Sequence, residues 1–257
     1  MKPKVLVLRV SGTNCDKETY TALKIVGFDV CLAHINQIIR KEIKLYEYNL
    51  LVIPGGFSFG DYISAGKIFA IELMYKLRKD LENFINEKKF IIGICNGFQV
   101  LVKLGLLPKP NFVQQVTLTE NDSMKFECRW VYLKVNKKNP SVLSCLPEII
   151  ELPVAHKEGK FFAEQKVIDE IIQKNYFLFQ YCDIYGNVEV GYPLNPNGAI
   201  KNIASITDST GRVIGLMPHP ERFVIPHQYP LFSSENKKEI IPFGKLFFEL
   251  IKKEIEK

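Results

Sequence analysis

Long apolar runs are missing from this sequence of 257 residues. None reaches the roughly 18–20 residues that a membrane-spanning helix needs. The chain begins Met1-Lys2-Pro3-Lys4-Val5 and passes directly into a strand-like segment, which argues against a cleavable signal peptide. We therefore expect no contact with a membrane and a cytoplasmic location.

Cysteine and histidine at metal-binding spacing are also missing. The six cysteines include no C-x-x-C pair, and no histidine lies at zinc-ligand spacing. A disulfide framework is unusual in a chain of this size without secretion signals. The sequence therefore predicts no metal site, and it predicts that most cysteines are small buried hydrophobic residues.

Arginine is scarce, with six residues among 34 basic ones, and lysine supplies most of the net charge of +6. The lysines are interspersed with acidic residues along helix-like stretches such as 76–89 and 245–257, which is typical of a solvated surface. The sequence has no clustered basic motif, no Gly-Lys-Ser/Thr and no G-x-G-x-x-G. We expect no nucleic-acid partner and no ATP-binding loop in this chain.

The first half of the chain alternates strand-like and helix-like segments. Short apolar runs predict strands at 5–10, 28–32, 50–53 and 90–94. Helices are expected between and after them, at 16–26, 37–45, 65–87 and 97–104. This alternation predicts an α/β, flavodoxin-like fold with a largely parallel sheet and helices on both faces.

The second half is richer in strands and turns. Strands are expected at 126–135, 149–154, 176–181, 203–206 and 213–217, a short helix at 169–174 and a terminal helix at 243–256. Asn195-Pro196-Asn197-Gly198 is the strongest turn signal. Because there is no internal repeat and no linker long enough to separate domains, we expect residues 1–257 to form one domain.

One cysteine has a distinctive context. Gly93-Ile94-Cys95-Asn96-Gly97 has the G-x-nucleophile-x-G form of a nucleophile elbow, between a predicted strand and a predicted helix. Unpaired N–H groups at a helix N-terminus stabilise a thiolate, and the N–H of Asn96 is placed to bind an oxyanion. Taken alone, the segment is equally consistent with a small residue at a crowded turn.

Two further segments, each after a predicted strand, favour catalysis. Met217-Pro218-His219-Pro220-Glu221-Arg222 places a potential base two residues before a carboxylate that could orient it. Pro54-Gly55-Gly56 lets the backbone approach a ligand and direct an N–H at negative charge. Catalytic groups of open α/β sheets gather at the C-terminal strand ends, so the sequence predicts a site with Cys95, His219 and Glu221.

These segments resemble the class I, or triad, glutamine amidotransferases, and most closely the glutaminase subunits of phosphoribosylformylglycinamidine synthase. The cysteine elbow and the Pro-Gly-Gly loop are shared across class I. The resemblance to the synthase subunits covers nearly the whole chain. It is carried by G-T-N-C-D at 12–16, G-G-F-S-F-G-D at 55–61, N-D-S at 121–123, F-E-C-R-W at 126–130, H-K-E-G at 156–159, N-P-N-G at 195–198 and M-P-H-P-E-R at 217–222.

The resemblance implies a thioester reaction on glutamine. Cys95 would attack the side-chain amide, His219 would shuttle the proton, Glu221 would orient His219, and water would hydrolyse the glutamyl thioester. The oxyanion hole and the glutamine site would be formed by Gly55, Gly56, Asn96 and Gln99.

The resemblance also implies partner subunits. The ammonia would pass to a large synthetase subunit, which would use ATP and Mg to convert formylglycinamide ribonucleotide to the amidine in purine biosynthesis. A small accessory subunit would join the complex, and this chain would need no cofactor of its own. The sequence departs from the family pattern at Ser64, Lys157 and Ala199, on loops where we place contacts with partners.

Three other interpretations remain open from the sequence. A class I amidotransferase of nucleotide amination or amino-acid synthesis would share the triad, although the F-E-C-R-W and G-F-S-F-G-D segments favour purine synthesis. An α/β chaperone or stress protein would carry histidine directly after the cysteine, where this chain has Asn96. A non-catalytic regulatory subunit is disfavoured because Cys95, His219 and Glu221 are all present. His156 is equally consistent with the border of the site and with a partner surface.

Overall fold

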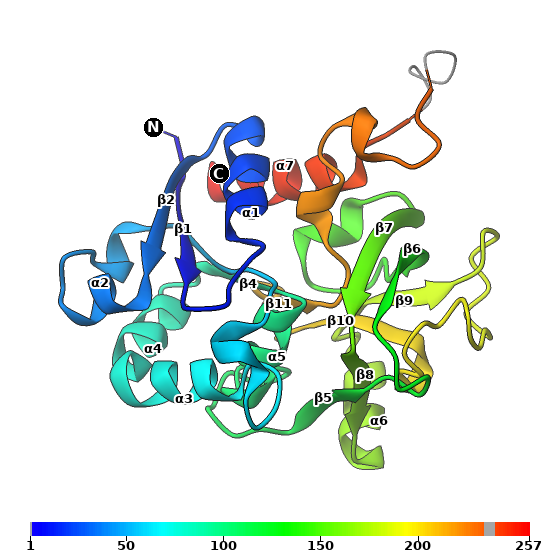
Figure 1. The fold of residues 1–257 in the computed structure, drawn as a ribbon, viewed down its shortest axis with the longest axis horizontal. Helices are drawn as coiled ribbons and strands as arrows, with labels where there is room; N and C mark the ends of the chain where they lie inside the picture. Colours follow the sequence, from blue (N-terminus) through cyan, green and yellow to red (C-terminus); the bar gives the residue numbers. More distant parts are fainter. Residues whose placement is uncertain (1, 234–239) are drawn as a thin grey trace.

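A nine-stranded sheet forms the centre of the computed structural model, which describes residues 2–233 and 240–257 (Figure 1). Five neighbouring strands run parallel, in the order β2 (Asp29–His34), β1 (Lys4–Arg9), β3 (Leu50–Ile53), β4 (Phe90–Ile94) and β11 (Val213–Leu216). The sheet continues with antiparallel pairings through β10 (Ile203–Thr207), β9 (Phe177–Cys182), β6 (Glu127–Val135) and β7 (Ile149–His156). Strands from both halves of the chain therefore share one sheet; the assignment of residues 1–257 to one domain stays a prediction.

Helices cover both faces of the parallel part, which confirms the predicted α/β class (Figure 1). On one side lie α1 (Asp16–Val26) and α7 (Phe243–Ile255), which contact each other. On the other side lie α3 (Lys67–Lys76), α4 (Arg78–Asn86) and α5 (Asn96–Lys103). Every residue of β3, β4 and β11 is buried, as expected for parallel strands covered on both faces.

Two strands were not predicted. β5 (Val116–Glu120) pairs with β8 (Glu158–Ala163) in a separate two-stranded sheet. The alternation of apolar and polar residues in Val-Thr-Leu-Thr-Glu was a usable signal for β5. β8 follows β7 after a single intervening residue, Lys157, so the second strand carried no turn signal of its own.

Three predicted helix boundaries were wrong. The helix expected at 65–87 is two helices, because Leu77 (φ −128°, ψ 11°) leaves the helical conformation and buries its side chain in the core. The helix expected at 37–45 is α2 (Ile35–Ile39), which ends before Lys41 at φ 61°. The helix expected at 169–174 is α6 (Gln165–Gln173). Short 3-10 helices span Leu45–Glu47 (η1), Ser58–Asp61 (η2), Val142–Cys145 (η3), Ile200–Asn202 (η4), Pro220–Arg222 (η5) and Pro226–Gln228 (η6).

The candidate site lies where the parallel strands end. The loops after β1, β3, β4 and β11 leave the same edge of the sheet, and the Cys15 N–H after β1 donates to Gly55 O after β3 at 3.2 Å. This is the edge at which open α/β sheets bind ligands. Within residues 2–233 and 240–257, no helix combines the length and the apolar character needed to cross a bilayer.

Candidate active site

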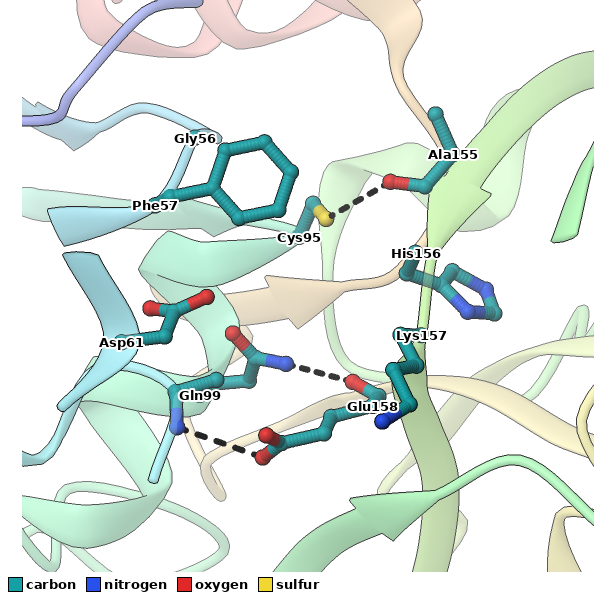
Figure 2. Close-up of a pocket in the computed structure, with 10 residues that line it drawn as sticks. Gly56, Phe57, Asp61, Cys95, Gln99, Ala155, His156, Lys157 and Glu158 are labelled. Atoms are coloured by element: carbon teal, nitrogen blue, oxygen red, sulfur yellow. Dashed lines mark hydrogen bonds between the residues drawn. The ribbon is translucent and has the colours of Figure 1, made fainter. Parts of the chain in front are cut away.

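Cys95 is the single residue between β4 and α5. Its backbone (φ 50°, ψ −105°) lies outside the helical and strand regions, a strained conformation that in proteins concentrates at functional sites. Its N–H donates to Leu216 O of β11 at 2.8 Å, and its Sγ donates a weak hydrogen bond to Ala155 O at 3.6 Å (Figure 2). The turn therefore has the geometry of a nucleophile elbow.

Glycines make this elbow sterically possible. A Cβ at Gly93 would lie 2.5 Å from Gly97 O, and a Cβ at Gly97 would overlap Ile53 O of the neighbouring strand. Since real Cβ atoms do not approach backbone this closely, any side chain at either position would displace α5 from β3 and β4. The G-x-C-x-G pattern thus reports close backbone packing around Cys95.

His219 and Glu221 form a buried pair directly after β11. His219 Nδ1 lies 2.6 Å from Glu221 Oε1, and each residue is only 1% exposed. Burial alone lowers the pKa of His219, but the charges of Glu221 and Cys95 outweigh it and hold the pKa well above its ordinary value. Glu221 therefore stabilises the imidazolium form, as a carboxylate in a triad does.

His219 and Cys95 come together next to Gly55. A Cβ at Gly55 would lie 2.8 Å from His219 Cε1 and 3.5 Å from the Cβ of Cys95. His219 Nε2 is buried and has no hydrogen-bond partner among the described residues, so it can accept or donate a proton. The three residues predicted as a triad are thus brought into one place by β4, β11 and the loop after β3.

The loop after β3 is held against the loop after β1. Gly56 has φ 138°, and a Cβ there would lie 2.7 Å from Asn14 N. Phe57 N donates to Gly12 O at 2.9 Å. In the part of the chain that the structure describes, neither Gly56 N nor Asn96 N donates a hydrogen bond. Both N–H groups predicted for the oxyanion hole are therefore available to a ligand.

The side chains of Asn96 and Gln99 connect the walls of the site. Asn96 Oδ1 accepts from Ser58 N at 3.3 Å, and its Nδ2 donates to Asp61 Oδ1 at 3.1 Å and to Gln99 Oε1 at 2.9 Å. Gln99 Nε2 in turn donates to Glu158 O. Gln99 lines the pocket, and its part in binding glutamine stays a prediction. The bridging by the Asn96 side chain was not predicted.

A pocket of about 190 Å³ opens beside Cys95 (Figure 2). This volume suits a small metabolite, since pockets for drug-sized ligands run to about 300–1,000 Å³. Two carboxylates face it, and burial, reinforced by the charge of Glu158, raises the pKa of Asp61. Its lining comprises Gly56, Phe57, Asp61, Ala65, Cys95, Gln99, Ala155, His156, Lys157 and Glu158.

The wall at 155–158 is the main feature of the site that sequence reasoning missed. Ala155 O and Glu158 O reach Cys95 and Gln99 through main-chain atoms, which leave no signature in residue type. The only signal was the H-K-E-G segment, which left His156 undecided between the site and a partner surface. The structure places the backbone of His156 at the pocket, with its ring pointing away from Cys95 (Figure 2).

A second buried thiol lies behind the triad. Cys15, Glu18, His219 and Glu221 offer ligand atoms within 4.8 Å of one another. The cation in this cluster is Arg222, which donates to Glu18 Oε1 at 2.9 Å and to Cys15 Sγ at 3.3 Å. Burial raises the pKa of Cys15 to about 11 and keeps it a neutral thiol. The expected absence of a metal site stays a prediction.

Comparison with known proteins gives consistent results along the whole chain. Residues 2–252 match the CobB/CobQ-like glutamine amidotransferase domain. A Picrophilus torridus protein named phosphoribosylformylglycinamidine synthase subunit PurQ is 45% identical, over 96% of this chain and 97% of that protein. The protein of the same name from Dehalococcoides mccartyi is 43% identical, over 98% of this chain and 97% of its own length.

A solved structure agrees with these sequence matches. A chain in the structure of PurLQS from Thermotoga maritima is 32% identical and superposes with a TM-score of 0.71, covering 97% of this chain and 98% of that one. The similarity therefore extends through the parallel and the antiparallel parts of the sheet.

Proposed function

The chain belongs to the CobB/CobQ-like glutamine amidotransferase family, and on that basis we propose that it is the glutaminase subunit of a phosphoribosylformylglycinamidine synthase. It hydrolyses glutamine to glutamate and ammonia and supplies the ammonia to a synthetase subunit. The observation that carries the proposal is the meeting of a strained, buried Cys95 with the His219–Glu221 pair beside a small pocket.

The first half of the reaction forms a thioester. Cys95 Sγ, as a thiolate, attacks the side-chain amide carbon of glutamine, and the carbonyl oxygen becomes an oxyanion. The available N–H groups of Gly56 and Asn96 are the proposed donors to that oxygen, a contribution of about 3–4 kcal/mol per donor in comparable sites. His219 gives its proton to the leaving nitrogen, so ammonia departs and a glutamyl thioester remains.

The second half returns the enzyme to its starting state. Neutral His219 takes a proton from water, the hydroxide adds to the thioester carbon, and the Cys95 thiolate leaves as glutamate forms. His219 ends protonated beside the Glu221 carboxylate, where its raised pKa favours that form. The His219 imidazole thus acts first as acid and then as base, while Glu221 keeps it oriented.

The pocket has groups that suit the amino-acid end of glutamine. The carboxylates of Asp61 and Glu158 face the cavity and can bind the α-ammonium group. The Gln99 amide of α5, which already bonds to Asn96 and to Glu158 O, keeps a second hydrogen and a second lone pair for a ligand. Substrates that lack the α-ammonium group are therefore poor ligands in this proposal.

The partners follow from the relatives. The Thermotoga structure is that of PurLQS, so the partners of this chain are the corresponding large synthetase subunit and a small third subunit. ATP and Mg are bound by the synthetase, which converts formylglycinamide ribonucleotide to formylglycinamidine ribonucleotide. This chain supplies no cofactor, and we place the complex in the cytoplasm.

The proposal is tested by following ammonia transfer in the reconstituted complex. With synthetase, small subunit, ATP, Mg and formylglycinamide ribonucleotide, glutamine is expected to support amidine formation with one glutamate released per product. The isolated chain is expected to hydrolyse glutamine slowly. Fast glutamine hydrolysis that is indifferent to the synthetase, or amidine formation only from added ammonia, would refute the proposed role.

Exposed apolar residues lie next to Phe57 and Asp61 of the pocket lining. The ring centroids of Phe57 and Phe126 are 6.3 Å apart, and both residues are about half exposed. Tyr62 and Ile63 follow Asp61 of the pocket and are exposed by 74% and 84%. Ile63 has φ 73°, a conformation that is unfavourable for a β-branched residue and has no packing benefit here. A surface of this kind fits the synthetase that receives the ammonia.

Replacing Ile63 with asparagine is expected to weaken association with the synthetase about tenfold and to leave the isolated chain as stable as before or more so. Asparagine tolerates positive φ, so the backbone strain falls while the apolar contact is lost. Binding is measured by calorimetry and stability by thermal unfolding. Tyr75→Asp, at an equally exposed position near the end of α3, is the control and should bind normally. Unchanged binding by Ile63→Asn would remove this loop from the interface.

A further inference from the structure

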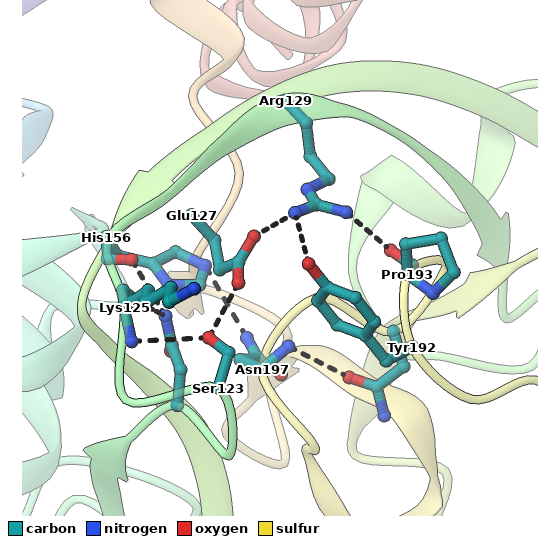
Figure 3. A network of polar contacts seen from close by, with 10 residues as sticks. Ser123, Lys125, Glu127, Arg129, His156, Tyr192, Pro193 and Asn197 are labelled. Atoms are coloured by element: carbon teal, nitrogen blue, oxygen red, sulfur yellow. Dashed lines mark hydrogen bonds and ion pairs between the residues drawn. The ribbon is translucent and has the colours of Figure 1, made fainter.

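Segments that carry the family resemblance converge behind the pocket wall (Figure 3). Asn121 is at their centre: its Nδ2 donates to His156 O and to Lys125 O, both at 2.9 Å. Its Oδ1 accepts from Gly159 N at 3.1 Å and lies 3.2 Å from His156 Nδ1. Asn197 from the N-P-N-G turn approaches the other side of the imidazole, with Nδ2 3.5 Å from Nε2.

These contacts define the tautomer of His156. The amide nitrogen of Asn121 faces two carbonyl oxygens, so its oxygen must face the imidazole. His156 Nδ1 therefore carries the proton and donates to Asn121, and Nε2 accepts from Asn197. Burial, and then the nearby charge of His219, lower the pKa of His156 to about 3, so the ring is neutral throughout the working pH range.

The network holds a short segment of main chain that reaches the reaction centre. Residues 155–158 run from the end of β7 to the start of β8, and Ala155 O contacts Cys95 Sγ while Glu158 O accepts from Gln99. The backbone of Asn121 also binds this segment: its N–H donates to Lys157 O at 2.9 Å. A shift of the His156 backbone would therefore move both carbonyl groups relative to the pocket.

Gly159 lets the imidazole lie against the backbone of β8. A Cβ at Gly159 would come within 2.8 Å of three atoms of the His156 ring. His156 as a whole residue is only 3% exposed, so its ring has no room to move aside. The glycine of the H-K-E-G segment is thus matched to the histidine three positions before it.

We propose that His156 is a positioning residue of the glutaminase reaction: the Asn121–His156–Gly159 packing sets the place of the main-chain wall at 155–158 that holds glutamine against Cys95. His156 does not touch the reacting atoms, since its ring points away from Cys95 (Figure 2). The inference depends on the proposed glutaminase function, and it adds a determinant of glutamine binding that lies outside the triad.

The position of the wall predicts which kinetic constant changes. Cys95 follows β4 and His219 follows β11, whereas the wall belongs to β7 and β8. The His219 N–H donates to Pro153 O of β7 at 2.8 Å, at a residue that precedes the wall. A displaced wall should misplace glutamine more than it disturbs the triad. Contacts that glutamine makes with this wall are present in the ground state and in the transition state alike. Their loss should therefore lower kcat/KM for glutamine about tenfold to a hundredfold, mainly through KM.

The experiment measures glutamine-dependent and ammonia-dependent amidine formation by the full complex carrying His156→Ala or His156→Asn. Alanine should raise KM for glutamine without changing the shape of the pH profile or the ammonia-dependent rate. Asparagine keeps a donor toward Asn121 and should recover most of the loss. If alanine does not fold, Gly159→Ala is the informative variant, since its Cβ presses on the His156 ring and should raise KM. Normal KM in both variants, or a shifted pH profile, would overturn the proposal.

Two further variants separate positioning from general loss of stability. Asn139 is an equally buried amide in a network with Asn175, Phe177 and Thr207, away from the pocket, so Asn139→Ala should lower stability but leave KM normal. As a single variant, Gly159→Ala should raise KM for glutamine. In combination with His156→Ala, which removes the ring, it should cause no further loss. Positioning through the His156–Gly159 contact would be contradicted by either of two results. One is a loss of kcat/KM in the double variant that equals the product of the two single losses, and the other is a raised KM in Asn139→Ala.

The wild-type complex distinguishes the two levels of inference. If it fails to form amidine from glutamine, the proposed function is wrong. If it forms amidine and the His156 variants behave as wild type, only the role of His156 is wrong.

Discussion

Replacing Cys95 with alanine is expected to lower glutamine-dependent amidine formation by about 10⁴- to 10⁶-fold, the range seen when a catalytic nucleophile is removed. The backbone of the elbow allows this change, because alanine retains the Cβ and loses only Sγ. The lost atom is the one that forms the thioester, so no residual covalent route remains. Glutamate release in the complex and trapping of a thioester by rapid acid quench provide the measurement.

Ammonia-dependent synthesis separates this effect from failed assembly. The variant complex should use added ammonia at the wild-type rate, because the synthetase chemistry lies on another chain. Cys182→Ala is the matched control: this cysteine is fully buried in β9, away from the pocket, and its loss should leave glutamine use unchanged. Near-normal glutamine turnover by Cys95→Ala would remove the nucleophile from the proposal.

Replacing Glu221 with glutamine is expected to lower kcat/KM for glutamine by about 10²- to 10⁴-fold, as a neutral amide no longer orients or stabilises the imidazolium. In the native pair the carboxylate keeps the pKa of His219 high despite burial. Protonated His219 is needed to release ammonia, so activity is lost as pH rises through its pKa. Without the negative charge that pKa falls, and the alkaline limb of the rate profile moves to lower pH.

The pH profile of the complex measures this shift directly. Glu151→Gln is the control, because this partly buried carboxylate accepts from Tyr229 OH, lies outside the cluster around His219 and should leave the alkaline limb in place. A limb that stays at its wild-type pH in Glu221→Gln would show that His219 titrates independently of Glu221. A limb that moves to higher pH would reverse the assigned sign.

The catalytic loops were the most predictable part of the site, for a physical reason. A strained turn packed against a neighbouring strand tolerates only glycine beside the nucleophile, so Gly93 and Gly97 mark Cys95 in the sequence. His219 and Glu221 are two residues apart after a strand, and their pairing needs no long-range information. The roles assigned to these residues in catalysis stay proposals until the variants are measured.

The pocket wall could not be predicted in the same way. Ala155 and Glu158 contribute carbonyl oxygens, and every residue type has one. Their placement depends on the contacts of β7 and β8 with Asn121. Asn121 and His156 are 35 residues apart in the chain. The break at Leu77 was missed for a related reason, since burial of that side chain in the core overrides a helical pattern that runs through it.

The order of these elements along the chain has a consequence during protein synthesis. The nucleophile is made early, at residue 95, but the wall at 155–158 and the His219–Glu221 pair are translated much later. A ribosome adding about 5–20 residues per second exposes the thiol for seconds before its base exists. Nascent chains and truncated products therefore carry the nucleophile without the acid that releases ammonia. Glutamine hydrolysis by the proposed route therefore requires residues that are translated near the end of the chain.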